Sequence, residues 1–309
     1  MKQTDKEKTD SRLAMQNKDF RQAINFAFDR HAYAAQTNGE DGADRILRNT
    51  VTPSNFVQIG GKNFGDAVNE KMVNYGTEWS NINLNDAQAA FLAPEKAKAE
   101  FAKAKESLQA EGVTFPIHLD MLVDQTAKLD VQQASSFKQT VEATLGSDNV
   151  VIDIIQLSPD EKDNATFFAD TADQKDYDID ISGWSGDFSD PKTYLDLLDP
   201  DSGSQLKNLG LTPGKDNDIK EKLGLATYKK LLDAADSENE NTQTRYEKFA
   251  EVQAWLTDSA LFLPVQSGGA NPIFRKTVPF TGPFSFVGHK GDSDNYKYVE
   301  LQKEPVTAK

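Results

Sequence analysis

The alternation of apolar and polar side chains is most informative along residues 177–198, which read YDIDISGWSGDFSDPKTYLDLL. Apolar residues at positions 177, 179 and 181 alternate with polar residues at 178, 180 and 182, a two-residue period typical of a β-strand with two different faces. Gly183 and Gly186 then end the strand in a tight turn, and Pro191 opens a short helix over residues 192–198. The segment therefore predicts a strand, a glycine-rich turn and a helix.

Before this segment, two predicted strands flank a helix. Residues 115–123 and 150–155 have the strand pattern. Between them lies an apolar stripe at helical spacing, made of Ala134, Phe137, Val141 and Leu145. A strand, a helix and a second strand form a right-handed crossover almost without exception, and this implies parallel pairing. With a short helix expected within residues 158–175, the three strands predict a small sheet with helices on its faces.

Most of the remaining pattern is helical. The segments with helical spacing of apolar residues are 19–35, 94–110, 218–235 and 242–258. Residues 38–80 are rich in glycine, asparagine and proline, so long surface loops are expected there. Short strands are expected at residues 260–265 and 296–301, and the polar residues 1–17 are expected to form a flexible lead.

Composition narrows the classes of function. The 309-residue chain has no cysteine, which excludes thiol catalysis, disulfides and cysteine-ligated metals, and it has no apolar run long enough to cross a membrane. Its net charge of -15 and the lack of a basic stripe argue against nucleic acid as a partner. Residues 199–204 begin like a calcium loop, but the later bidentate glutamate is absent, so no metal or other cofactor is expected.

The turn after residue 183 carries the candidate chemistry. It presents Trp184, Ser185, Asp187 and Phe188 at the carboxyl end of a strand, where ligands of α/β proteins usually bind. A partly desolvated carboxylate among aromatic rings suits a ligand cation, such as the α-ammonium group of a peptide. The alternative is a solvated acidic loop with Trp184 packed into the core, and the pattern alone leaves both interpretations open.

Three segments carry a resemblance to a known family. The run GWSGDFSDP, followed by TYLDLL, is similar to a GW-x-x-D-(F/Y)-x-(D/E)-P segment. DFRQAINFAFDRHAY, at residues 19–33, resembles an early helix, and residues 242–265, ending in SALFLPV, resemble a late helix followed by a strand. In this order and at this spacing they resemble the oligopeptide-binding family, the solute-binding subunits of ABC-type peptide importers. The resemblance covers roughly residues 18–301 and is strongest to the oligopeptide-binding lipoproteins of Gram-positive cocci.

The resemblance implies an α/β fold, a type II periplasmic-binding-protein-like lobe with a mixed sheet flanked by helices. Residues 18–266 match the second lobe of the family, and residues 267–309 match a segment that returns toward the first lobe. The first lobe, with its signal peptide and lipidated cysteine, has no counterpart in this sequence. The chain is therefore expected to be an excised lobe or a truncated gene product.

The implied function is the capture of oligopeptides outside the cell for delivery to a membrane permease. The resemblance gives Asp187 the role of anchoring the α-ammonium group, with Trp184 and Ser185 lining the same end of the groove and Gly186 and Phe188 in the same loop. The full-length protein would be a monomer, lipid-anchored at the extracellular face of the cell membrane. By itself this chain is expected to bind peptides weakly, because it lacks the opposite lobe.

Two other classes of protein stay open. A hydrolase would need paired acids, or a nucleophile with a base, but the three histidines of the chain are scattered. Asp178 and Asp180 could mimic a catalytic pair and are better explained as solvated or helix-capping residues. A peptide-sensing receptor or adhesion module could use the same lobe without transport, and only the identity of its partners distinguishes it.

Overall fold

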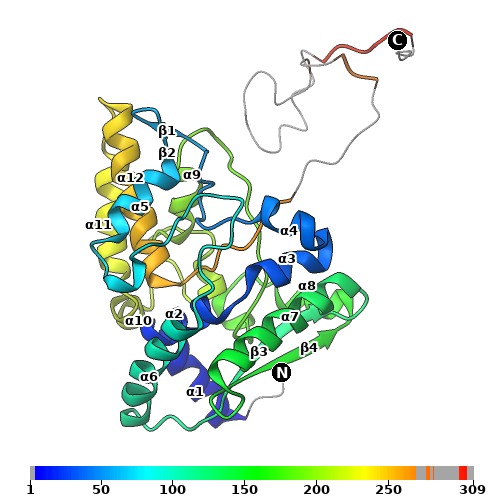
Figure 1. The fold of residues 1–309 in the computed structure, drawn as a ribbon, viewed down its shortest axis with the longest axis vertical. Coiled ribbons are helices and arrows are strands. Elements are labelled where there is room, and N and C mark those ends of the chain that lie inside the picture. The colour runs from blue at the N-terminus through cyan, green and yellow to red at the C-terminus, as the bar shows by residue number, and fades with distance from the viewer. Residues whose placement is uncertain (1–3, 269–275, 279–280, 282–298, 305–309) are drawn as a thin grey trace.

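The computed structural model of the chain describes residues 4–268, 276–278, 281 and 299–304 (Figure 1). The α-helices are α1 (Asp5–Gln16), α2 (Lys18–Ala27), α3 (Arg30–Asn38), α4 (Glu40–Ile46), α5 (Phe64–Met72), α6 (Pro94–Ala110), α7 (Lys128–Leu145), α8 (Pro159–Ala165), α9 (Lys192–Leu195), α10 (Asn217–Lys222), α11 (Leu225–Asp236) and α12 (Thr242–Ser259). The strands are β1 (Gln58–Ile59), β2 (Lys62–Asn63), β3 (Ile117–Asp124) and β4 (Val150–Leu157). Short 3₁₀ turns lie at Thr77–Trp79, Ala172–Gln174, Asp196–Leu198 and Leu206–Leu209.

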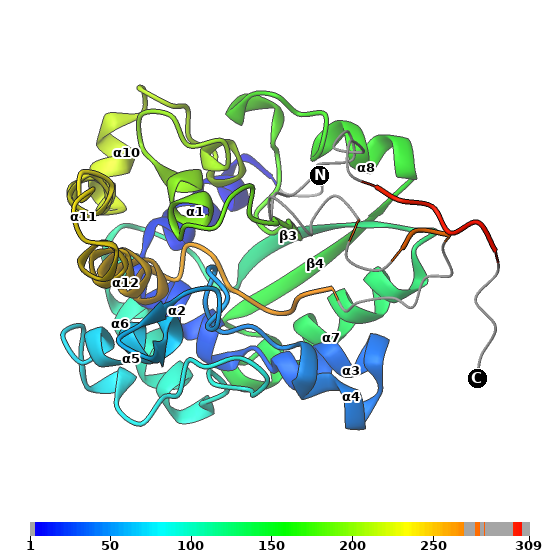
Figure 2. The ribbon, with the colours of Figure 1, turned by 90° about the horizontal axis from the view of Figure 1, so that it is seen from above.

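Strands β3 and β4 pair in parallel, as the crossover pattern predicts. Their register runs from Ile117 opposite Val150 to Asp124 opposite Leu157, with α7 as the connection. Figure 2 shows α7 on one side of this pair and α8 on the other. The side chains at positions 117, 119, 121 and 123 are at most 2% exposed and form part of the core beneath α7. The predicted helices over residues 94–110 and 242–258 are confirmed as α6 and α12.

The predicted third strand over residues 177–183 is wrong in extent. A single parallel bridge joins Ile179 to Met121. The backbone N–H groups of Asp178 and Ile179 both donate to the Asp120 carbonyl, at 3.1 and 3.0 Å, and the Asp178 carboxylate accepts from the Asp120 N–H at 2.8 Å. Because one residue of β3 takes up all these bonds, no ladder extends from it. The alternating pattern therefore corresponds to a single contact with β3. Ile181, which lies beyond that contact, is 45% exposed.

Two predicted helices are each divided in the structure. The helix expected over residues 19–35 ends at Ala27, and α3 starts anew because the Asp29 carboxylate accepts from the Ala32 N–H at 2.9 Å. The helix expected over residues 218–235 divides at Gly224, whose φ of 76° is left-handed and therefore interrupts the helical path. Apolar spacing continues through both breaks, so periodicity does not reveal them.

Two segments expected to be irregular contain helices. Most of the expected flexible lead is α1, which starts with a capping box between Thr4 and Glu7 and buries Asp10 against Thr114. Residues 38–80 include α4, α5 and the β1–β2 hairpin, so the expectation of loops alone is wrong. The Thr4-to-Glu7 spacing was a readable signal for α1.

The end of the chain departs from its predicted strands. Residues 260–265 form no strand: a single antiparallel bridge joins Gln266 to Leu47. The predicted strand over residues 296–301 lies partly outside the described residues, and at its described end Leu301 forms an antiparallel bridge with Thr277. The boundary proposed at residue 266 stays a prediction.

A buried arginine ties the start of the chain to the segment after α12. Arg30 is 1% exposed, and its guanidinium donates to Pro264 O at 2.7 Å and to Asn25 O at 3.1 Å. The rings of Phe28 and Phe91 lie 5.0 and 4.4 Å from it. Burial lowers the pKa of Arg30 to about 9, so the group is still charged at neutral pH. The charge is therefore held by carbonyl oxygens and ring faces.

We expect the substitution Arg30→Met to lower the free energy of unfolding by about 2–4 kcal/mol, because it leaves buried carbonyl groups without donors. Urea unfolding followed by circular dichroism measures this change. The control is Arg45→Met, at an exposed position of α4, where a change within about 0.5 kcal/mol is expected. Equal unfolding midpoints for the two variants would contradict the role given to Arg30.

A partly buried carboxylate makes the stability of the fold depend on pH. Burial raises the pKa of Asp180, although Lys162 Nζ lies 3.8 Å from its Oδ1 atom. The ionised form is thus less favourable in the folded chain than in the unfolded chain. Its cost to stability is absent below the unfolded pKa of about 3.9 and grows as the pH rises toward the raised folded value.

The substitution Asp180→Asn should therefore raise the urea midpoint at pH 7 and leave it unchanged near pH 3. The exposed Asp170 supplies the control substitution Asp170→Asn, for which no difference is expected at either pH. A lower midpoint for Asp180→Asn at pH 7 would show that the contact with Lys162 outweighs burial.

Candidate functional site

The predicted binding loop lies on the surface, between the Ile179 bridge and α9. Trp184 and Phe188 are 37% and 39% exposed, and Ser185 and Asp187 between them are also exposed. The loop is therefore solvated, as the alternative interpretation expects, but Trp184 does not pack into the core as that interpretation also expects. An exposed acidic side chain thus lies on the same short loop as two half-exposed aromatic rings.

Three hydrogen bonds fasten this loop to the helix that follows it. Trp184 Nε1 donates to Thr193 O at 2.9 Å, and the Asp187 N–H donates to Thr193 Oγ1 at 2.8 Å. Between them, the Gly186 N–H donates to the Tyr194 hydroxyl at 3.1 Å. Thr193 is buried, so it is a firm attachment point. The loop conformation is thus set by residues 193 and 194, which the sequence pattern did not single out.

Gly186 is where the loop comes closest to this support. A Cβ atom at this position would lie 3.0 Å from Thr193 Cγ2 and 3.2 Å from Tyr194 Cε2. A Cβ atom at Gly183 would meet nothing within 4 Å. A methyl group at position 186 would therefore have to push these side chains away by a few tenths of an ångström, whereas one at position 183 would displace nothing.

An arginine from α12 holds the far end of the loop. Arg245 donates to both carboxylate oxygens of Asp190, at 2.7 and 3.2 Å, and the ring of Phe249 lies 4.8 Å from its guanidinium carbon. The hydrogen bond to Asp190 is the main cause of the raised pKa of Arg245. Asp190 in turn accepts from the Lys192 N–H at 3.0 Å, which starts α9. A fork-to-fork pair of this kind fixes orientation as well as distance.

The electrostatic surroundings of the loop are acidic. Burial raises the pKa of Asp196, and the negative charges of Asp199, Asp236 and Asp187 contribute to the shift, against the opposing charge of Lys192. Lys192 itself pairs with Asp236 at 2.7 Å. Within the described residues the Asp187 carboxylate takes no hydrogen bond or ion pair. An exposed, uncompensated carboxylate in an acidic region attracts cations.

The other candidate groups do not form a reactive site. The Asp178 carboxylate is bonded to the backbone of β3, neither solvated nor capping a helix, and Asp180 lies beside Lys162. His31 contacts Asp44, and His118 contacts Asp153. His289 lies outside the described residues. The part of the chain that the structure describes contains no cluster of three His, Asp or Glu residues able to hold a metal ion, and none of its helices is long and apolar enough to span a bilayer.

Comparison with known proteins supplies the family. The family described as bacterial extracellular solute-binding proteins, family 5 Middle, matches residues 5–205. AliA, an oligopeptide-binding protein of Streptococcus pneumoniae, is 55% identical over 310 residues, which cover 99% of this chain and 47% of AliA. SarA, an oligopeptide-binding protein of Streptococcus gordonii, is 51% identical over 310 residues, which cover 100% of this chain and 47% of SarA. The chain thus spans about half the length of the curated relatives it matches.

The fold agrees with this assignment. The structure of OppA from Listeria monocytogenes bound to peptide matches with a TM-score of 0.57 and 18% identity, over 94% of this chain and 46% of OppA. The predicted α/β, type II periplasmic-binding-protein-like fold is thereby confirmed, with a smaller sheet in the described residues than the sequence pattern predicts. The chain belongs to the bacterial extracellular solute-binding proteins of family 5.

Proposed function

We propose that this chain forms the part of an ABC importer's solute-binding protein that holds the amino end of an extracellular oligopeptide. The observation that carries the proposal is the exposed Asp187 carboxylate, which has no partner among the described residues and is flanked in sequence by Trp184 and Phe188. The relatives AliA and SarA are both named as oligopeptide-binding proteins, which supports peptide as the ligand class. No enzymatic step is proposed, because the described histidines and acids are not arranged around a nucleophile.

Recognition would begin at the terminal amine of the peptide. The α-ammonium group offers N–H donors that the two Asp187 oxygens accept as charge-assisted hydrogen bonds. The rings of Trp184 and Phe188 flank this carboxylate in sequence and offer apolar faces to the first peptide residue. The backbone at Ser185 and Gly186 borders the same place. Since every peptide has this amine, binding here tolerates many sequences.

The remaining parts of the mechanism extend beyond this chain. Because the relatives are about twice as long, we infer a second lobe that closes over the peptide and excludes water, which strengthens each polar contact. A membrane permease that receives the peptide, a lipid anchor at the extracellular face and a monomeric state complete the proposal. Residues 267–309 would return to that other lobe, which corresponds to the first lobe of the family.

The first test concerns the amine. We expect Asp187→Asn to weaken the binding of a peptide with a free amino end by about ten- to a hundredfold, because charge-assisted hydrogen bonds are lost. Calorimetry on the 309-residue chain, and on a chimera in which it replaces the matching half of AliA, measures the change. The same peptide with an acetylated amino end is the control, since it should bind both forms equally weakly. Tight binding of the acetylated peptide would contradict the role of Asp187.

A second test concerns the shape of the loop. Gly186→Ala should displace the loop from Thr193, lower the free energy of unfolding by about 1 kcal/mol and weaken peptide binding severalfold. Gly183→Ala is the matched control, with open space around its added methyl group, and should leave both quantities unchanged. Thermal unfolding and calorimetry on the two variants give the comparison. Equal behaviour of the two variants would show that loop position does not govern binding.

A further inference from the structure

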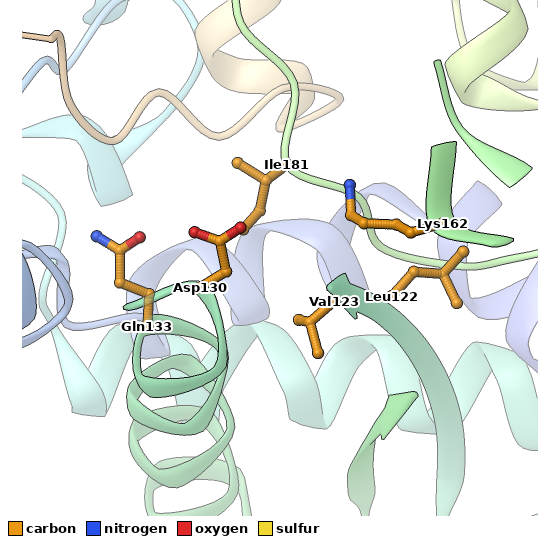
Figure 3. A pocket seen from close by; sticks show the side chains of 6 residues that line it. All are labelled: Leu122, Val123, Asp130, Gln133, Lys162 and Ile181. Atoms are coloured by element: carbon orange, nitrogen blue, oxygen red, sulfur yellow. The ribbon is translucent and has the colours of Figure 1, made fainter. Parts of the chain in front are cut away.

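A small cavity lies where β3 ends and α7 begins. It has a volume of about 110 Å³ and is lined by Leu122, Val123, Asp130, Gln133, Lys162 and Ile181. Figure 3 shows that these side chains come from the end of β3, the first turns of α7, the neighbourhood of α8 and the segment before the binding loop. A water molecule occupies about 30 Å³ in the liquid, so roughly three or four groups of that size fit.

The polar groups of the cavity are not paired with one another. Gln133 is 6% exposed, and its Nε2 atom is buried without a hydrogen-bond partner among the described residues. Asp130, in the first turn of α7, takes no hydrogen bond or ion pair in the described part of the chain. The nearest acid to Lys162 Nζ is Asp180, at 3.8 Å, which is too far for a hydrogen bond.

An unpaired buried amide needs an explanation, because it costs free energy that an apolar side chain of similar size would not. Among the described residues, no contact of Gln133 occupies its Nε2 donor. Its neighbours on the buried face of α7 are Ala134, Ser136 and Phe137, so an apolar residue would pack there. The amide is therefore best explained by a partner that enters the cavity.

The charges of the cavity select among possible partners. A carboxylate would be repelled by Asp130, and an ammonium or guanidinium group would be repelled by Lys162. An apolar side chain would leave the Gln133 amide and the Asp130 carboxylate without partners. A neutral group that both donates and accepts hydrogen bonds can pair with the side chains of Asp130, Gln133 and Lys162 together. A carboxamide does this with three heavy atoms, which the cavity volume accommodates.

We propose that this cavity, which we call the α7 pocket, receives the side-chain carboxamide of an asparagine or glutamine in the bound peptide. The ligand amide donates to Asp130, and its carbonyl accepts from Gln133 Nε2 and Lys162 Nζ. The floor of Leu122, Val123 and Ile181 contacts the methylene groups. The inference rests on the proposed function, since it assumes that a peptide is bound at Asp187.

The position of the pocket limits which peptide residue it serves. Ile181 and Asp187 belong to one segment, six residues apart, and a chain of that length spans at most roughly 20 Å. An extended six-residue peptide whose amine lies at Asp187 is therefore long enough to reach the α7 pocket. The pocket would thus add sequence preference to binding that is otherwise tolerant.

The test uses sets of six-residue peptides with free amino ends, in which one position carries Gln, Glu, Lys or Leu in an alanine background. Positions two to six are scanned in turn by calorimetry, with the 309-residue chain and the AliA chimera. At one position the Gln peptide should bind about tenfold more tightly than the Leu, Glu and Lys peptides. N-acetylglutaminamide, which has the carboxamide but no free amine, should have no effect as a competitor, because the carboxamide must come from a peptide held at Asp187.

Two variants identify the pocket as the source of this preference. Gln133→Leu should abolish the preference for Gln over Leu while leaving the thermal midpoint unchanged or raised, since it removes an unpaired amide. Its matched control is Gln132→Leu, at an exposed position of the same helix, which should keep the preference. Asp130→Asn should allow the Glu peptide to bind as well as the Gln peptide. The Glu carboxylate would then pair with Lys162 without being repelled by Asp130.

The outcomes separate this inference from the proposed function. If all peptides bind with equal affinity and Asp187→Asn still weakens them, the pocket assignment is overturned and the proposed function stands. If no peptide binds to either protein, both are overturned. If N-acetylglutaminamide competes, the pocket binds a free carboxamide and the assignment to a peptide side chain is wrong. A Gln preference lost in Gln133→Leu and kept in Gln132→Leu supports the inference.

Discussion

Arginine side chains that donate to backbone carbonyl groups join segments of this chain that lie far apart in the sequence. Arg21 binds the carbonyl groups of Ser259 and Met15, and Arg30 binds that of Pro264, so the first helices are joined to the end of α12. Arg245 donates to the carbonyl groups at the end of α11 and also to the Asp190 carboxylate. A described sheet with one parallel pair satisfies few backbone groups. The guanidinium groups, each with several donors in a fixed plane, satisfy carbonyl groups where strands do not.

This arrangement explains how a short surface loop can present a defined binding group. Helix α9 has four residues and could not hold a loop by itself. The Asp190–Arg245 pair joins α9 to α12. Thr193 of α9 in turn accepts a hydrogen bond from the Asp187 N–H and so fixes the loop. The carboxylate of Asp187 is exposed in an acidic region and has no partner among the described residues. Binding a cation there requires little rearrangement, and preorganisation of this kind lowers the entropic cost of binding.

Much of the fold could be predicted from local patterns. The parallel β3–β4 pair, α6, α7 and α12 follow from apolar spacing and from proline and glycine at their ends. The breaks at Asp29 and Gly224 and the single bridge at Ile179 could not, because apolar spacing runs unchanged through them. The five residues of the proposed binding loop were chosen by pattern and resemblance together, and their role in binding stays a prediction. Thr193 and Arg245 were not chosen, since contacts across 6 and 55 residues leave no periodic signal.

The central claim is that the amino end of a peptide lies against the loop that carries Asp187. The most direct measurement is photo-crosslinking with a peptide whose first side chain bears a diazirine, followed by mass spectrometric mapping of the adducts on the 309-residue chain. Crosslinking captures weak complexes, so it does not require the second lobe. The account predicts adducts within residues 184–188 that a tenfold excess of the unlabelled peptide removes. Adducts confined to other surfaces of the chain would contradict it.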